Sequence, residues 1–316
     1  ATGAPGADDV SLLVRGHSTY NGGDGPLILV DGVERSMAYI NPNEVESVTI
    51  LKDAASCAVY GIKAAAGVIL VTTKRGTEGK TTINYKGSLT LSHATTLPEF
   101  MNGTHYMQWY NYARRMDGEK AYFTDEEIAM TTNGDPTDGF ENTDWQEPIY
   151  RTTLMHQHNL SISGGNEKTR YFLSGGFMKQ NGFIKGFELE RGNFRSHIDT
   201  QVTKDISVSL NVAGKINDHY QPGGDSYENQ TTNNVVGVLL YAAPFVPLEY
   251  EGMPASGYRG ASNPDYAAGH SGYSKIRTMR LETSAKIEYS VPFLKGLKAG
   301  MFVGWDWQDR DSRSFK

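Results

Sequence analysis

The chain has 316 residues, and its 36 Asp and Glu against 30 Lys and Arg give a formal net charge of −6 at pH 7. That balance, with no basic stripe along the chain, argues against nucleic-acid binding. No run of about 18 apolar residues is present, which excludes a helical membrane protein. Strands that cross a bilayer need no such run because alternate residues are polar, so a membrane β-barrel stays open.

Residues 10–76 are predicted to form a small α/β unit. Its strands are expected at 10–15, 27–30, 45–51 and 67–73. The continuous apolar runs among them indicate strands that are buried on both faces. Helical turns are expected after Asn41, which precedes Pro42, and after Asp53, because both residues are good N-caps. The second helix is expected at Ala54–Tyr60, where Gly61 ends it.

From Thr81 onward the hydrophobic pattern has a period of two. In 206–216, for example, the even-numbered residues are apolar apart from Gly214, and most odd-numbered residues are polar. Such alternation is typical of a sheet whose two faces meet different surroundings. Seven strands are predicted on this basis, at 83–91, 158–163, 170–178, 193–202, 206–216, 279–289 and 297–307.

The connections between these strands alternate in length. Those at 164–168, 204–205 and 292–296 are tight, whereas those at 93–155, 179–191 and 219–274 are long. Outer-membrane barrels have short turns at one end and long loops at the other. A soluble sandwich is the alternative, with its apolar face packed on a second sheet. Long strands, with Tyr289, Trp305 and Trp307 on the apolar face and Arg195, His197 and Asp199 on the polar face, favour the barrel.

Several segments resemble the plug domain and early barrel strands of SusC/RagA-type TonB-dependent outer-membrane transporters. They are Pro26–Val33, Ile40–Ala54 with its Leu-Lys-Asp-Ala ending, Val59–Gly61, Ala64–Gly76 and Phe177–Phe194. The resemblance implies a β-rich membrane protein in which a small α/β plug domain lies inside a transmembrane antiparallel β-barrel of 22 strands, about seven of them present here. It also implies location in the Gram-negative outer membrane.

The division expected from this resemblance is a plug domain at 1–78 and an N-terminal part of the barrel at 79–316, with long extracellular loops at 93–155 and 219–274. The chain departs from the family because no TonB box precedes Ala1 and only about seven strands follow the plug. We therefore expect a partial chain. The implied partners are a SusD-like surface lipoprotein, TonB, and an oligosaccharide or peptide cargo.

Three residues of a glycine-rich plug loop are candidates for cargo binding. Tyr20 offers a stacking face, and Asn21 and Asp24 offer hydrogen bonds to hydroxyl groups. The alternative is a flexible turn with no ligand.

Polar contacts between plug and barrel are expected as well. Arg15, Glu46, Lys52 and Arg75 lie in the plug motifs and are expected to pair with charges on the polar barrel face such as Glu282 and Glu288. Such contacts rearrange at modest cost when a plug is pulled, unlike a dry core. The alternative is ordinary surface charge.

No catalytic set, cofactor motif or metal-ligand cluster stands out, so an enzyme is not expected. Aromatic residues of the long loops suit sugar stacking or docking of a lid protein, against the alternative that the loops pack on each other. They are Trp109, Tyr110, Trp145, Tyr241, Tyr258 and Tyr266. A short helix is expected at Asn233–Tyr241, at the lid interface.

The function expected from these features is energised import of a bulky nutrient across an outer membrane. Two alternatives stay open. One is a siderophore or cobalamin receptor of the same fold, and the other is a secreted β-rich binding or adhesion protein.

Overall fold

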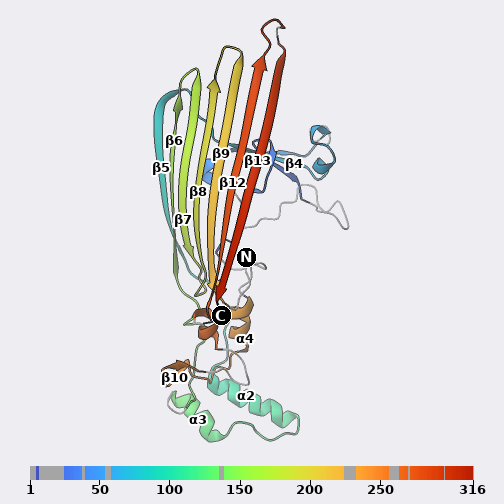
Figure 1. Cartoon of the computed structure of the whole chain (residues 1–316). Helices are drawn as coiled ribbons and strands as arrows, with labels where there is room; N and C mark the ends of the chain where they lie inside the picture. The colour runs from blue at the N-terminus through green and yellow to red at the C-terminus, as the bar shows by residue number, and fades with distance from the viewer. Residues whose placement is uncertain are drawn as a thin grey trace.

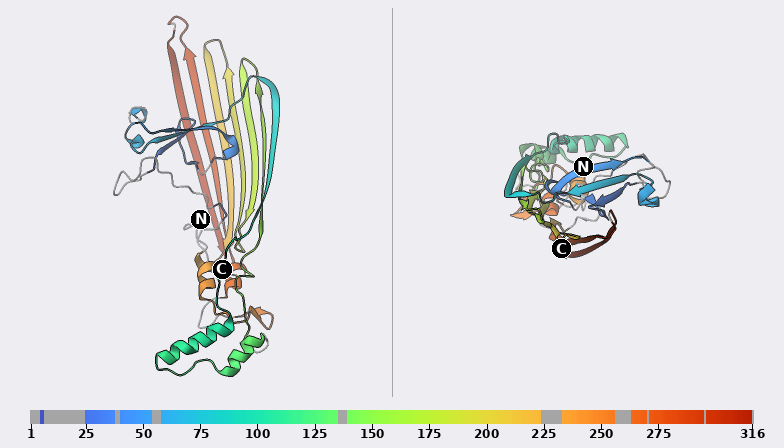
Figure 2. Two further views of the ribbon diagram at one scale, coloured as in Figure 1. Left: turned by 180° about the vertical axis from the view of Figure 1, so that it is seen from behind. Right: turned by 90° about the horizontal axis from the view of Figure 1, so that it is seen from above.

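The computed structural model describes residues 5–6, 25–37, 40–53, 58–134, 139–223, 233–255, 263–269, 271–294 and 296–315. Within these residues the chain forms a small sheet of four strands, a large sheet of seven, and a two-stranded ribbon of β10 (Glu249–Tyr250) and β11 (Met253–Pro254). The small sheet lies beside the large one, about midway along its strands (Figures 1 and 2).

The small sheet has the strand order β2-β1-β4-β3. Its strands are β1 (Leu27–Val30), β2 (Val33–Glu34), β3 (Val45–Leu51) and β4 (Val68–Thr73). β1 and β4 are parallel, and their buried Val30, Ile69 and Val71 form a core with Ile40. Asp31 and Gly32 form the turn between β1 and β2, and both have positive φ, at 50° and 86°. Asp-Gly favours this two-residue hairpin turn because glycine adopts positive φ without strain.

The helical parts of the small unit are 3₁₀ turns. Pro42–Glu44 forms η2, and the side chain of Asn41 caps it by accepting from the Asn43 N–H, as the sequence predicts. The expected helix at 54–60 differs: Ala58–Tyr60 is the 3₁₀ turn η3, followed by η4 (Ile62–Ala64), while residues 54–57 lie outside the described part of the chain. The strand expected at 10–15 also lies outside it.

The large sheet is antiparallel throughout, in the order β13-β12-β9-β8-β7-β6-β5. Its strands are β5 (Gly79–Ser92), β6 (Thr153–Gly165), β7 (Thr169–Asn181), β8 (Glu188–Gln201), β9 (Ile206–Pro222), β12 (Tyr273–Ser290) and β13 (Lys298–Phe315). All seven predicted strands are present, and each is longer than its alternating segment. Strands of this length exceed the 5–6 residues usual in soluble sheets.

The two ends of the large sheet differ in their connections, and we call them the turn end and the loop end. The links β6–β7, β8–β9 and β12–β13 are short and lie at the turn end, at the top of Figure 1. The links β5–β6 and β9–β12 are long and lie at the loop end. The prediction of a long loop at 179–191 is wrong. β7 and β8 remain paired out to Asn181 and Glu188, which leaves only 182–187 between them.

The two faces of the large sheet differ in polarity. One face, here called the inner face, curves around the small sheet, as the right-hand view of Figure 2 shows. Buried polar side chains line it, among them Arg195, Asn211 and Glu282. The outer face carries large apolar side chains such as Phe194 and Ile216, each nearly half exposed. No described element covers this apolar face, unlike the inner face of a soluble sandwich.

The long loops form a joint module at the loop end. It contains α2 (Gly103–Met116), α3 (Asp125–Asn133), α4 (Asn233–Tyr241) and α5 (Pro264–Gly269). Its largest core cluster joins residues from both long connections: Met107, Phe123, Trp145, Leu239, Ala243, Phe245, Val246 and Ala255. The loops therefore pack on each other, and α4 has the bounds that the sequence predicts. Trp109 and Tyr241 are exposed, whereas Tyr258 lies outside the described residues.

Within the described residues, the helices are too short or too polar to cross a bilayer.

Candidate functional site

The first contact between the two sheets is a buried ion pair made by Glu44. Because Asn41 and Pro42 start η2, Glu44 falls at its end and points toward β7 and β8. One carboxylate oxygen accepts from the Arg195 Nε at 2.8 Å, and the other accepts from Ser174 and Asn193 at 2.9 and 2.6 Å. The Glu44 and Arg195 side chains are 5% and 1% exposed. Such a pair is well satisfied, and removing either partner leaves a buried charge.

A set of asparagines extends this contact toward β6. The side-chain amide of Asn41 donates to the Asn159 oxygen at 2.7 Å and to the Asn193 oxygen at 3.2 Å. Lys86 on β5 donates to the Asn43 oxygen at 3.2 Å. The η2 turn thus reaches strands β5, β6, β7 and β8 with hydrogen-bonding groups alone.

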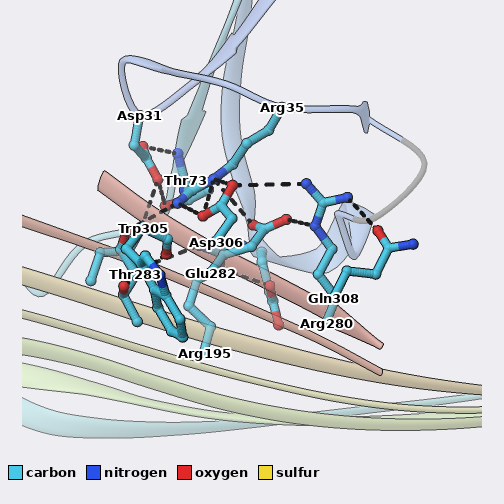
Figure 3. Close-up of polar contacts among 12 residues, drawn as sticks. Asp31, Arg35, Thr73, Arg195, Arg280, Glu282, Thr283, Trp305, Asp306 and Gln308 are labelled. Atoms are coloured by element: carbon cyan, nitrogen blue, oxygen red, sulfur yellow. Dashed lines mark hydrogen bonds and ion pairs between the residues drawn. The ribbon is translucent and has the colours of Figure 1, made fainter. Parts of the chain in front are cut away.

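The second contact is made by Arg35, which follows β2 and whose side chain is 1% exposed. Its guanidinium donates to both carboxylate oxygens of Asp306 on β13 and, at 3.2 Å, to the Thr283 carbonyl on β12. Glu282 lies 3.7 Å from its Nε. Figure 3 shows Arg35 reaching from the small sheet to these two strands. A planar guanidinium suits this paired recognition of a carboxylate.

Arg280 balances the carboxylates around Arg35. Its Nε lies 2.9 Å from Glu282 Oε1, its Nη2 lies 3.8 Å from Asp306, and its Nη1 donates to Gln308 at 3.3 Å (Figure 3). Two guanidinium groups and two carboxylates therefore share one corner of the inner face. Equal opposite charge reduces the cost of holding these groups away from water.

The two contacts meet around Lys215, which is buried on β9. A small space between them is lined by Glu44 and Arg195 on one side and by Arg280 and Glu282 on the other, with Lys215 between. The contacts of η2 and of Arg35 are thus parts of one charged cluster rather than separate patches.

The β1–β2 turn approaches the large sheet between these contacts. Asp31 accepts from the Thr73 N–H at 3.0 Å and from its hydroxyl at 2.6 Å, and from the Asn211 amide at 3.3 Å. One carboxylate therefore ties the turn to β4 and to the inner face of β9. The Val33 side chain lies against Gly304 of β13, where an added Cβ would come within 3.1 Å of it.

A short segment, Lys74–Glu78, joins β4 of the small sheet to β5 of the large one. It enters β5 at the turn end, because Gly79 pairs with Gly165 beside the tight β6–β7 turn. Gly76 is buried there, and a Cβ on it would lie 2.2 Å from the backbone nitrogen of Tyr171. Backbone cannot move aside as a flexible side chain can, so only glycine fits.

We expect Gly76→Ala to destabilise the protein by about 1–3 kcal/mol, because overpacking forces a backbone shift. The free energy of unfolding, from denaturant titration of the full-length protein in detergent, measures it. Gly25→Ala is the matched control, since nothing lies within 4 Å of a Cβ at Gly25. Equal stability of the two variants would show that the approach to Tyr171 is not constrained.

A polar cavity of about 560 Å³ lies between the sheets toward the turn end. Asp31 and Arg75 border it from the small unit, and His197, Asp199 and Glu288 border it from the large sheet. His197 Nε2 and Asp199 Oδ2 are 3.2 Å apart. The space is large enough for ordered water, which lets polar groups exchange partners at low cost.

Only some of the sequence-predicted contact residues lie where the two sheets meet. Glu282 does contact the small sheet, but through Arg35. Glu46 and Lys52 are exposed, and none of the ion pairs within the described residues joins them to Glu282 or Glu288. The reason is geometric: the small sheet meets the inner face with η2 and the β1–β2 turn, not with β3.

Arg75 and Glu288 border the same cavity, and Glu288 pairs with Lys286 at 3.1 Å. The remaining candidates, Arg15, Tyr20, Asn21 and Asp24, lie outside the described residues. Sequence reasoning missed Arg35, Asn41 and Glu44 as contact residues. The one local signal is that the N-cap places Glu44 at the end of a short polar turn.

Comparisons of the sequence find related proteins. The model of the TonB-dependent receptor plug domain matches residues 1–68. The chain is 32% identical to TonB-dependent receptor P39 of Formosa agariphila, over 99% of this chain and 28% of that protein. It is 29% identical to TonB-dependent receptor SusC of Bacteroides thetaiotaomicron, over 84% of this chain and 26% of that protein. The chain spans 19–28% of the length of the curated relatives that it matches.

Solved structures show the same fold. The RagAB peptide importer in its open-open state matches with a TM-score of 0.74 at 22% identity, covering 96% of this chain and 36% of that chain. Its closed-closed state matches with a TM-score of 0.73 at 21% identity, covering 92% and 35%.

Proposed function

Because the chain belongs to the SusC/RagA-type TonB-dependent receptors, of which it carries plug and early barrel strands, we propose that the whole protein imports a bulky nutrient across an outer membrane. In this proposal 1–78 is the plug domain and 79–316 is the first part of the barrel wall. The plug closes the barrel at rest, and a pull from TonB displaces it and opens the path.

The observation that carries the proposal is the chemistry between the two sheets. Hydrogen bonds and ion pairs of Arg35, Asn41 and Glu44 hold the small sheet against the wall. Water replaces polar partners of this kind readily, whereas separating a dry apolar core costs about 25 cal/mol for each Å² exposed. A plug held in this way can shift without its own apolar core opening.

The two ends of the wall support a direction of transport. Outer-membrane barrels keep short turns on the periplasmic side and long loops outside. The segment Lys74–Glu78 joins the plug to the wall at the turn end, so a pull from the periplasm reaches the plug through the same side. The loop module then faces the medium.

For cargo and partner, we propose an oligosaccharide or peptide delivered with a SusD-like lipoprotein lid. The related SusC and the similar RagAB peptide importer support this class. The loop module offers exposed aromatic side chains, Trp109 at 59% and Tyr241 at 83%, and aromatic residues are enriched at protein interfaces. Tyr20, Asn21 and Asp24 are proposed to contact cargo on the plug.

The test is uptake by cells that express the full-length receptor. We expect labelled oligosaccharide or peptide to accumulate, and accumulation to fall to background when TonB is deleted or the proton gradient is collapsed. Purification in mild detergent, followed by mass spectrometry, is expected to recover a surface lipoprotein with the receptor.

Other outcomes would contradict the proposal. TonB-dependent uptake of a ferric chelate or cobalamin alone would identify the other class of receptor. Recovery of the protein without detergent, in a form whose gel migration does not change on heating, would indicate a secreted binding protein instead.

A further inference from the structure

A row of ionisable side chains, most of them charged, crosses the outer face of the large sheet near the loop end. Successive Cα partners on six strands form it: His156, Lys179, Glu190, Asp218, Arg277 and Asp311. We call this set the charged row. It lies on the outer face of the sheet. Between the charged row and the turn end, most side chains on this face are apolar.

These apolar side chains, between the charged row and the turn end, form a band with the height of a bilayer core. On β9 it runs from Ile206 to Ile216, and on β12 from Tyr289 to Met279. Each segment has about eleven residues and thus about ten steps of about 3.3 Å, which at a tilt of about 40° span about 25 Å, the height of the apolar band on membrane barrels. Charged side chains cost about 2–4 kcal/mol at the midplane and little at the interface. The charged row therefore lies at the level of the lipid headgroups.

One part of this level holds more cations than anions. Lys275 and Arg313 are direct Cα partners on β12 and β13, one step beyond the charged row toward the loop end. Like charges directly opposite each other destabilise a strand pair. Together with Arg277 and Asp311 they line a cavity of about 70 Å³.

Neighbouring carboxylates neutralise this site only in part. Asp218 accepts from Arg277 at 2.7 and 2.6 Å and lies 3.4 Å from the Lys275 ammonium, which also stands 4.6 Å from the centre of the Tyr220 ring. Asp311 accepts from Arg313 at 2.9 Å. Among these contacting side chains, three cations thus face two carboxylates.

We propose that Lys275, Arg277 and Arg313 bind the phosphate group of a membrane lipid headgroup on the outside of the barrel wall. A phosphate between Lys275 and Arg313 relieves their repulsion, and the guanidinium groups present paired donors to its oxygens. Asp218 holds Arg277 in place from the opposite strand. The site lies at the level of the headgroups, at the loop end of the apolar band, and this position favours a lipid phosphate over a free one.

The experiment uses the full-length receptor, purified in detergent and stripped of lipid. Native mass spectrometry follows binding of a bis-phosphorylated glucosamine glycolipid, of phosphatidylglycerol and of inorganic phosphate. We expect the double variant K275Q/R313Q to raise the apparent Kd for a phosphorylated lipid at least about tenfold, one charge-assisted contact being worth about that factor. The matched control is K179Q, which removes a cation of the charged row that pairs with Glu190 at 2.7 Å on distant strands.

Three results would overturn the proposal. The first is unchanged lipid binding by K275Q/R313Q, and the second is equal weakening by K179Q. The third is inorganic phosphate binding as tightly as either lipid, which would make free phosphate the occupant. Heat-dependent gel migration verifies that each barrel is folded, and R313Q alone serves if the double variant does not insert. The experiment does not measure nutrient uptake. A negative result here therefore leaves the import function untouched, and a negative uptake result leaves the lipid site untouched.

Discussion

Replacing Glu44 with Gln is expected to weaken the attachment of the small sheet to the wall by about 3–5 kcal/mol, the cost of breaking a buried ion pair from one side. The variant keeps the shape of the side chain but leaves the Arg195 guanidinium, 1% exposed, without its carboxylate partner. Hydrogen exchange of the full-length receptor measures the change. Peptides that span 41–51 should exchange about two to four orders of magnitude faster than in the unmodified protein.

Glu46→Gln is the matched control for this prediction. Glu46 lies two residues further along and is exposed, so its neutralisation should change the local opening free energy by less than about 0.5 kcal/mol. Equal exchange in the two variants would show that the Glu44–Arg195 pair does not hold the plug.

A second variant separates a lost charge from lost packing. Combining Glu44→Gln with Arg195→Met removes both charges, so no buried ion is left unpaired. Replacing a whole buried pair is often neutral in stability, and we expect the double variant to recover most of the loss. A double variant that is weaker than either single one would mean that hydrogen bonds to Ser174 and Asn193, rather than charge, carry the attachment.

The large sheet shows how far sequence pattern reaches. A period of two predicts both where strands lie and which face each side chain takes, and the prediction of a plug with barrel strands is confirmed. The strands extend beyond the alternating segments because pairing continues where the outer face becomes charged, as at Lys179 and Glu190. Alternation marks the part of a strand whose outer face is apolar, not the whole of the strand.

The helices of the loop module mark a limit of the same method. The segment at α2 mixes aromatic and polar residues, and contacts with the other long loop hold it. α3 had a local signal that sequence reasoning missed: Thr124 and Glu127 form a capping box, each side chain bonding the other's backbone N–H. Such a pair predicts a helix start even inside a long loop.

The contact residues could not be predicted because their partners are remote in sequence. Arg35 meets a carboxylate 271 residues away, and Glu44 meets a guanidinium 151 residues away. The charges of Glu46 and Lys52 look similar in the sequence, yet both side chains are exposed. Only the orientation of the small sheet decides between them, and no local pattern encodes it.

Replacing Arg35 with Met is expected to cost about 3–5 kcal/mol as well, because it leaves Asp306 and the buried Glu282 with Arg280 as their nearest guanidinium. Hydrogen exchange of peptides spanning 27–37 measures the effect. Lys63→Met is the matched control: its pair with Glu34 has side chains 72% and 58% exposed, so we expect a change of less than about 1 kcal/mol. Adding Glu282→Gln to Arg35→Met should restore part of the loss.

The Arg35 and Glu44 variants together test whether the small sheet leaves the wall as one body. Both contacts border the small space around Lys215, and residues in one charged network are expected to couple by about 0.5–3 kcal/mol rather than add. If the small sheet leaves the wall as one body, either variant speeds exchange in both 27–37 and 41–51. If each variant speeds exchange only in its own segment, the contacts open independently, and plug movement begins with local remodelling instead of displacement of the whole sheet.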